Sequence, residues 1–103
     1  MKYRKIYAII YEAGCTSVKD RSNWQKVNKT LMEIRRPLWI ILESRKANLR
    51  LWVVHEHGKL RISTAQLNLH VDSKEYHDSQ RRYEFRNQGE MAAKLKVLLA
   101  GGS

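Results

Sequence analysis

The stretch Leu49–Val71, LRLWVVHEHGKLRISTAQLNLHV, decides the fold, because apolar and polar residues alternate on both sides of its His57-Gly58 pair. Alternation at a period of two is typical of β-strands, and a glycine-containing pair between two such runs is typical of a tight hairpin turn. With this pair as the loop, Trp52 lies opposite Ser63. The stretch therefore predicts two antiparallel strands with a defined register.

The two faces of this hairpin differ in chemistry. One face carries four cross-strand pairs: Glu56 with Lys59, Val54 with Arg61, Trp52 with Ser63, and Arg50 with Ala65. The other face is mainly aliphatic, with Leu49, Leu51, Val53 and His55 opposite Leu60, Ile62 and Thr64. Because register is set by which face is buried, we expect the aliphatic face to contact the core. Farther along, Leu67, Leu69 and Val71 take the opposite phase, which predicts a bulge or bend near Thr64–Gln66.

The N-terminal part of the chain supplies further elements. Tyr3–Ala13 is rich in Tyr and Ile and is apolar on both sides midway, which predicts a central strand covered on both faces. Its alternation places Tyr3, Tyr7 and Tyr11 on one side with Lys5, as a second aromatic and basic face. Cys15–Arg21 is predicted to be a loop.

Ser22–Arg36 is predicted to be a helix. Ser22 and Gln25 fit a capping box, and Pro37 ends the segment. The apolar residues fall on one stripe at spacings of three and four: Trp24, Val27, Leu31 and Ile34. This stripe is expected to pack on the sheet.

The remaining segments complete a sheet and a second helix. Leu38–Glu43 is a continuous apolar run that predicts an interior strand, followed by a turn over Ser44–Asn48. Asp72–Gln80 is polar and is predicted to be a loop, and Arg81–Phe85 a short last strand. After a turn at 87–89, Glu90–Ala100 is predicted to be a helix with four residues facing inward: Met91, Leu95, Leu98 and Leu99.

These elements predict an α+β fold. The expected architecture is a single domain over residues 1–100, with an antiparallel sheet of four to five strands and two helices mainly on one face, in the order β-α-β-β-β-(β)-α. Residues 101–103, Gly-Gly-Ser, are expected to be a flexible tail or an expression remnant.

The charge indicates the class of partner. The 103 residues include 20 Lys and Arg against 10 Asp and Glu, a formal net charge of +10. This balance favours a polyanionic partner, with nucleic acid first and an anionic membrane surface or an acidic protein next, while a charge kept only for solubility is the plain alternative. No apolar run approaches a membrane span, and no membrane partner is expected. The single Cys15 excludes an internal disulfide and suits the cytoplasm.

The basic residues are concentrated in the middle of the chain, where Arg35 to Arg61 includes seven basic and two acidic residues. Arg50, Trp52 and Arg61 project from one face of the hairpin, where guanidinium groups bind phosphates and an indole stacks on a base. Alternatively, Trp52 is buried beneath another element and the arginine stems flank it. The predicted nucleic-acid-binding residues are Arg50, Trp52, Lys59, Arg61, Arg45, Lys46, Lys26, Lys29, Arg81, Arg82 and Arg86.

The sequence contains no motif for catalysis, a metal or a cofactor. His55 and His57 form a His-x-His pair, but His57 is expected in the turn and no cysteine pair accompanies them. The leading hypothesis is therefore an accessory or regulatory nucleic-acid-binding protein without catalysis of its own. Whether it binds DNA or RNA, and whether it oligomerises, stays open.

Two alternatives remain. A metal-independent ribonuclease would use arginines to stabilise phosphate charge, and its candidate residues are Arg81, Arg82, Tyr83, Arg86 and His55. In size, charge and a helix followed by antiparallel strands, the chain is loosely similar to ribosome-dependent mRNA-cleaving toxins, without a motif that aligns residue by residue. The other alternative is a basic inhibitor or adaptor that binds an acidic protein.

Overall fold

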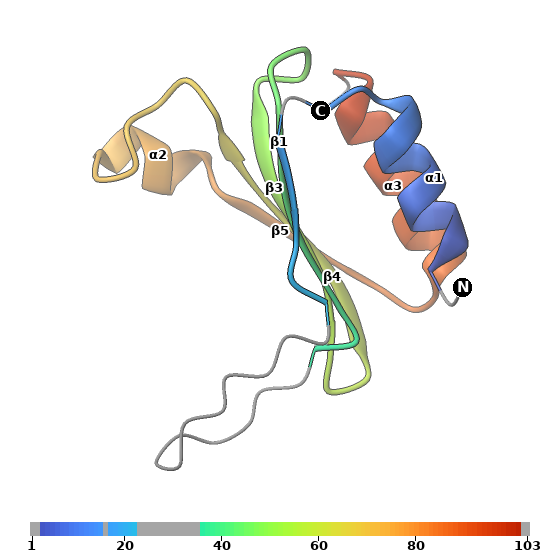
Figure 1. Cartoon of the computed structure of the whole chain (residues 1–103). Coiled ribbons are helices and arrows are strands. Elements are labelled where there is room, and N and C mark those ends of the chain that lie inside the picture. The colour runs from blue at the N-terminus through green and yellow to red at the C-terminus, as the bar shows by residue number, and fades with distance from the viewer. Residues whose placement is uncertain (1–2, 16, 23–35, 102–103) are drawn as a thin grey trace.

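The computed structural model describes residues 3–15, 17–22 and 36–101 (Figure 1). Five strands form one antiparallel sheet in chain order: β1 (Ser17–Asp20), β2 (Leu38–Ser44), β3 (Leu49–Glu56), β4 (Lys59–Gln66) and β5 (Arg81–Phe85). The described helices are α1 (Arg4–Glu12), α2 (Lys74–Ser79) and α3 (Gln88–Leu99). The predicted α+β class and antiparallel sheet are confirmed.

The hairpin has the predicted register. Trp52 pairs with Ser63 and Val54 with Arg61 across β3 and β4. The two turn residues both have positive φ, 51° at His57 and 75° at Gly58. Such a pair of conformations gives the tight turn whose twist matches that of the flanking strands, and glycine adopts it without a steric penalty.

Helices α1 and α3 lie side by side on one face of the sheet, and α2 lies on the other side (Figure 1). The core fills the space between the sheet and the helix pair, so the aliphatic hairpin face is buried as predicted, with Leu51, Val53 and Ile62 fully inaccessible. The four residues predicted to face inward from the last helix are all buried: Met91, Leu95, Leu98 and Leu99. This helix begins at Gln88 rather than Glu90, because the Asn87 side chain accepts a hydrogen bond from the Glu90 amide at 2.9 Å and caps it.

The prediction of a strand over Tyr3–Ala13 is wrong, because this segment forms α1. Its apolar residues also recur at spacings of three and four, and the helical period buries Ile6 and Ile10 beside α3. The predicted aromatic face is therefore wrong too: Tyr3 is buried in the core, whereas Tyr11 is 79% exposed. The edge of the sheet beside β2 is occupied instead by β1.

Two predicted loops contain regular structure. Cys15–Arg21 includes β1, whose four residues pair with β2 although Lys19 and Asp20 have low strand propensity. Asp72–Gln80 includes the short helix α2, which Ser73 caps by accepting a hydrogen bond from the Tyr76 amide at 3.1 Å. Six residues are too few to give a helical pattern in the sequence.

The predicted bulge near Thr64–Gln66 is wrong as well. The register between β3 and β4 runs without interruption to Gln66, where the strand ends. The change of phase at Leu67 therefore marks the end of β4. The predicted strand Leu38–Glu43 is confirmed and extends by one residue to Ser44, so the predicted turn Ser44–Asn48 is observed over 45–48. The predicted strand Arg81–Phe85 is confirmed.

The predicted helix Ser22–Arg36 lies outside the described residues except for its two ends, and so do Lys26 and Lys29. The described part contains three helices where the sequence predicted two in the whole chain. None of the described helices is long and apolar enough to cross a membrane.

Candidate functional site

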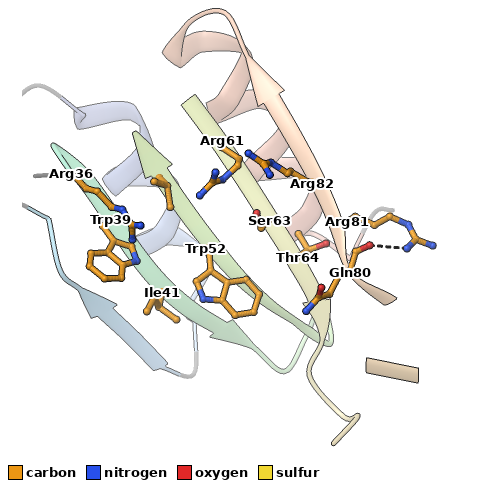
Figure 2. A pocket seen from close by; sticks show the side chains of 11 residues that line it. Arg36, Trp39, Ile41, Trp52, Arg61, Ser63, Thr64, Gln80, Arg81 and Arg82 are labelled. Atoms are coloured by element: carbon orange, nitrogen blue, oxygen red, sulfur yellow. Dashed lines mark hydrogen bonds between the residues drawn. The ribbon is translucent and has the colours of Figure 1, made fainter. Parts of the chain in front are cut away.

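The face of the sheet opposite α1 and α3 contains a hollow of about 560 Å³ (Figure 2). Four of the eleven residues that line it are arginines, two are tryptophans and none is acidic. We call the strand residues that line its centre the tryptophan face: Trp39 and Ile41 of β2, Trp52 and Val54 of β3, Arg61 and Ser63 of β4, and Arg82 of β5.

Strand register brings the two tryptophans together. Trp39 pairs with Val54, and Ile41 pairs with Trp52, so both indoles project from neighbouring central strands on the same side of the sheet. Such diagonal neighbours lie about 7–8 Å apart. Val54 is buried although it points away from the core, and with Ile41 it forms the apolar floor between the indoles. Trp52 is half-buried, so it is neither freely exposed nor covered by a described element.

Arg36 lines the hollow beside Trp39. Its Nε donates a hydrogen bond of 2.5 Å to Oε2 of Glu56, and its guanidinium lies 4.3 Å from the centre of the Trp39 ring. A guanidinium at this distance is attracted by the negative ring face. The Trp39 ring is thus already occupied by a cation.

Arg61 forms an ion pair with the same carboxylate, that of Glu56. Its terminal nitrogen is 3.5 Å from Oε1 of Glu56, so one carboxylate bridges two guanidinium groups. The Nε of Arg61 is buried, and within the described part it is the one buried side-chain nitrogen or oxygen without a hydrogen-bond partner. An unsatisfied buried donor costs about 1–3 kcal/mol.

Arg82 and Arg81 differ in orientation. Arg82 reaches from β5 toward Arg61 (Figure 2), is 62% exposed, and is 3.6 Å from Glu84, a pair too exposed to hold it firmly. Arg81 turns away from the tryptophans and donates to the carbonyl oxygens of Asp78 and Gln80 at 2.8 and 2.9 Å. Arg82 is therefore the better placed of the two for a ligand in the hollow.

No protein-family model, curated protein or solved structure matches this chain. The site is therefore interpreted from its own contacts.

The structure brings together only part of the predicted binding set. Trp52, Arg61, Arg81 and Arg82 line the hollow. Arg50 is on the same side of the sheet but is held at the far end, where it donates to the Tyr76 hydroxyl at 3.3 Å and lies 3.5 Å from Glu43. The hydrogen bond to Tyr76, more than the nearby Glu43, raises the pKa of Arg50.

The other predicted residues lie elsewhere. Lys59 follows the hairpin turn, beside a smaller hollow that includes Glu56 and Glu84. Arg45 and Lys46 occupy the β2–β3 turn at the opposite end of the strands, and Arg86 follows β5.

Two residues of the site were missed from the sequence, Arg36 and Trp39. The signal was present, because alternation within LWIILE places Trp39 and Ile41 on one face of β2. The continuous apolar run concealed it, since such a run predicts a strand buried on both faces. Arg36 was assigned to the end of a helix and was not related to the sheet.

The candidate ribonuclease residues do not form one site. His55 lies on the helix-covered face, where its Nδ1 is hydrogen-bonded to the Tyr3 hydroxyl at 2.6 Å. Tyr83 shares that face, with the Lys94 ammonium 4.5 Å from its ring centre, whereas Arg82 points to the opposite side. Nor do the described residues include a group of three or more His, Cys, Asp and Glu side chains able to bind a metal.

Proposed function

We propose that this protein binds nucleic acid through the tryptophan face. The observation that carries the proposal is the position of Trp52, half-buried in a hollow lined by four arginines and no carboxylate. Indoles stack on bases and guanidinium groups bind phosphates, so this combination suits a polyanion that also has aromatic rings.

The local charge balance supports a ligand more than internal packing. Arg36 and Arg61 share Glu56, and Arg82 contacts Glu84, so three of the four lining arginines contact two carboxylates within the described residues. Four guanidinium groups against two carboxylates leave a surplus of positive charge at the hollow. The surplus of positive charge adds to the formal net charge of +10 and favours approach of an anionic partner.

The proposal assigns binding and no catalytic step, as expected of an accessory or regulatory protein. We propose the cytoplasm as its compartment, because the single thiol of Cys15 suits a reducing environment.

The test compares two charge-matched double variants in binding to labelled single- and double-stranded DNA and RNA. Arg61→Gln with Arg82→Gln removes two charges from the tryptophan face. Arg4→Gln with Lys5→Gln removes two charges from exposed positions of α1, on the other side of the sheet. Circular dichroism and urea unfolding establish that each variant is folded.

We expect the first variant to weaken binding at least tenfold and to reduce the slope of log affinity against log salt by about 1–2. The α1 variant should change affinity only slightly, through long-range charge. Equal losses of affinity in both folded variants would mean that net charge alone attracts the nucleic acid and that the tryptophan face is not a specific binding site. Binding to acidic proteins but to no nucleic acid would contradict the proposal and favour the adaptor.

A further inference from the structure

The aromatic and cationic side chains that line the hollow come from different strands of the sheet. Across the sheet, Arg36 and Trp39 lie at the β2 side, Trp52 follows on β3, and Arg61 and Arg82 lie on β4 and β5 (Figure 2). Both indoles therefore lie toward β2 and β3, where Arg36 is already paired with Trp39, and the other two arginines named lie on β4 and β5. A ligand that matches this arrangement must present a flat ring and an anionic group side by side.

Trp52 is the aromatic group available for such a ring. The Trp39 ring already has the Arg36 guanidinium 4.3 Å from its centre and Arg21 at 5.9 Å. In the described part of the chain, no ring contact or cation contact involves the indole of Trp52. Its half-buried position restricts the side chain, and a restricted side chain loses less entropy when a ligand stacks on it.

The anionic group is expected at Arg61 and Arg82. These side chains come from neighbouring strands and are diagonal neighbours, because Ser63 pairs with Arg82 and Arg61 pairs with Glu84. The Arg61 side chain is 24% exposed and the Arg82 side chain is 62% exposed. Strands β3 and β5 are about 10 Å apart, at twice the ordinary strand spacing, a gap that long arginine side chains partly span.

The strandedness of the ligand follows from this arrangement. A duplex keeps its bases paired and stacked inside and presents phosphates outside, so an indole held within a hollow cannot reach the face of a paired base. A single strand can unstack one base and place it on an aromatic ring. Resting on the proposed function, we infer that the tryptophan face binds single-stranded nucleic acid, with one unpaired base on Trp52 and the adjoining phosphate at Arg61 and Arg82.

The test is a thermodynamic cycle that combines one protein substitution with one change in the ligand and compares the four binding affinities. The variant is Trp52→Leu, which keeps an apolar side chain and removes the aromatic ring; Trp52→Phe is the conservative control. The ligands are a labelled single strand, an abasic strand of the same length and charge, and the matched duplex, each as DNA and as RNA. Affinity is measured by fluorescence anisotropy at one salt concentration.

We expect wild-type protein to bind the single strand at least tenfold more tightly than the abasic strand or the duplex, in line with about 1–3 kcal/mol for one stacked base. Trp52→Leu should lose that preference and leave abasic affinity unchanged, and Trp52→Phe should retain most of it. The RNA and DNA forms identify which polymer is preferred.

The two proposals fail in different ways. Equal affinity for the single strand and the abasic strand, unaffected by Trp52→Leu, overturns the stacking inference and leaves nucleic-acid binding through charge. Tighter binding of the duplex overturns the inference in the same way. Absence of binding to every oligonucleotide overturns the proposed function itself.

Discussion

Replacing Glu56 with glutamine is expected to strengthen nucleic-acid binding while it weakens the fold. The carboxylate bridges Arg36 and Arg61, with contacts of 2.5 and 3.5 Å, and so engages two of the arginines that line the hollow. A glutamine keeps the size of the side chain and one acceptor oxygen but removes the negative charge. The variant therefore separates the stabilising role of the carboxylate from its effect on an incoming phosphate.

Both magnitudes can be estimated. The Glu56 side chain is 19% exposed, and losing the charge on two partly buried contacts should lower the free energy of unfolding by about 1–2 kcal/mol. A phosphate at Arg61 would lie roughly 6 Å from this carboxylate, where repulsion is about 0.7–3 kcal/mol for effective dielectric constants between 80 and 20. Screening by salt favours the lower part of that range, so affinity should rise about 3–10-fold.

The assay is anisotropy of a labelled single strand at physiological salt, with urea unfolding measured in parallel. Glu12→Gln, at the exposed end of α1, makes the same change in net charge on the other side of the sheet and serves as the control. Glu56→Gln should bind more tightly than this control. A folded Glu56→Gln protein that binds no better than Glu12→Gln would refute the idea that Glu56 competes with phosphate for these arginines.

Three further predictions concern the fold and the limits of the site. Ile6→Ala should lower the free energy of unfolding in urea by about 2–5 kcal/mol, because Ile6 is fully buried, whereas Tyr11→Ala should change it by less than about 0.5 kcal/mol; the reverse order would contradict the helical assignment of α1. Burial raises the pKa of Asp20, but hydrogen bonds from Ser22 and Tyr7 outweigh it and hold this pKa below its ordinary value of 3.8. The stability from these bonds is present above pH 4 and lost as pH falls through the lowered pKa, so Asp20→Asn should flatten the acid limb of a stability–pH curve, and an unchanged limb would contradict this role. Arg50→Gln should change affinity for a labelled single strand less than about twofold, since Arg50 is engaged outside the hollow, and a loss as large as that of the Arg61 variants would extend the site to the far end of the sheet.

The parts of the fold that could be predicted from sequence are those in which local signals agree. At His57-Gly58 the turn residues, the strand alternation and the cross-strand pairing all indicate one register, and the structure has that register. In Tyr3–Ala13 two periods fit the same residues, and burial of Ile6 and Ile10 beside α3 selects the helix. That choice depends on a partner element far along the chain, which local pattern does not contain.

In the candidate site too, local pattern predicts some contacts, and contacts between distant segments determine the others. Trp52 and Arg61 share a face because of the hairpin, so their proximity could be predicted. Trp39 joins them only through the pairing of β2 with β3, and Arg36 only through its contacts with Glu56 and the Trp39 ring. The bridging role of Glu56 likewise depends on contacts between segments that are distant in sequence, which no motif in the chain encodes.

The central claim is tested most directly by the affinity of the wild-type protein for a labelled single strand between about 50 and 200 mM salt. The account predicts micromolar or tighter binding at the low end, falling along a straight log–log line whose slope is about 0.7 for each phosphate contacted. With one phosphate at Arg61 and Arg82, that slope should correspond to at least one phosphate. No binding at the lowest salt, or an affinity that does not change with salt, would contradict it.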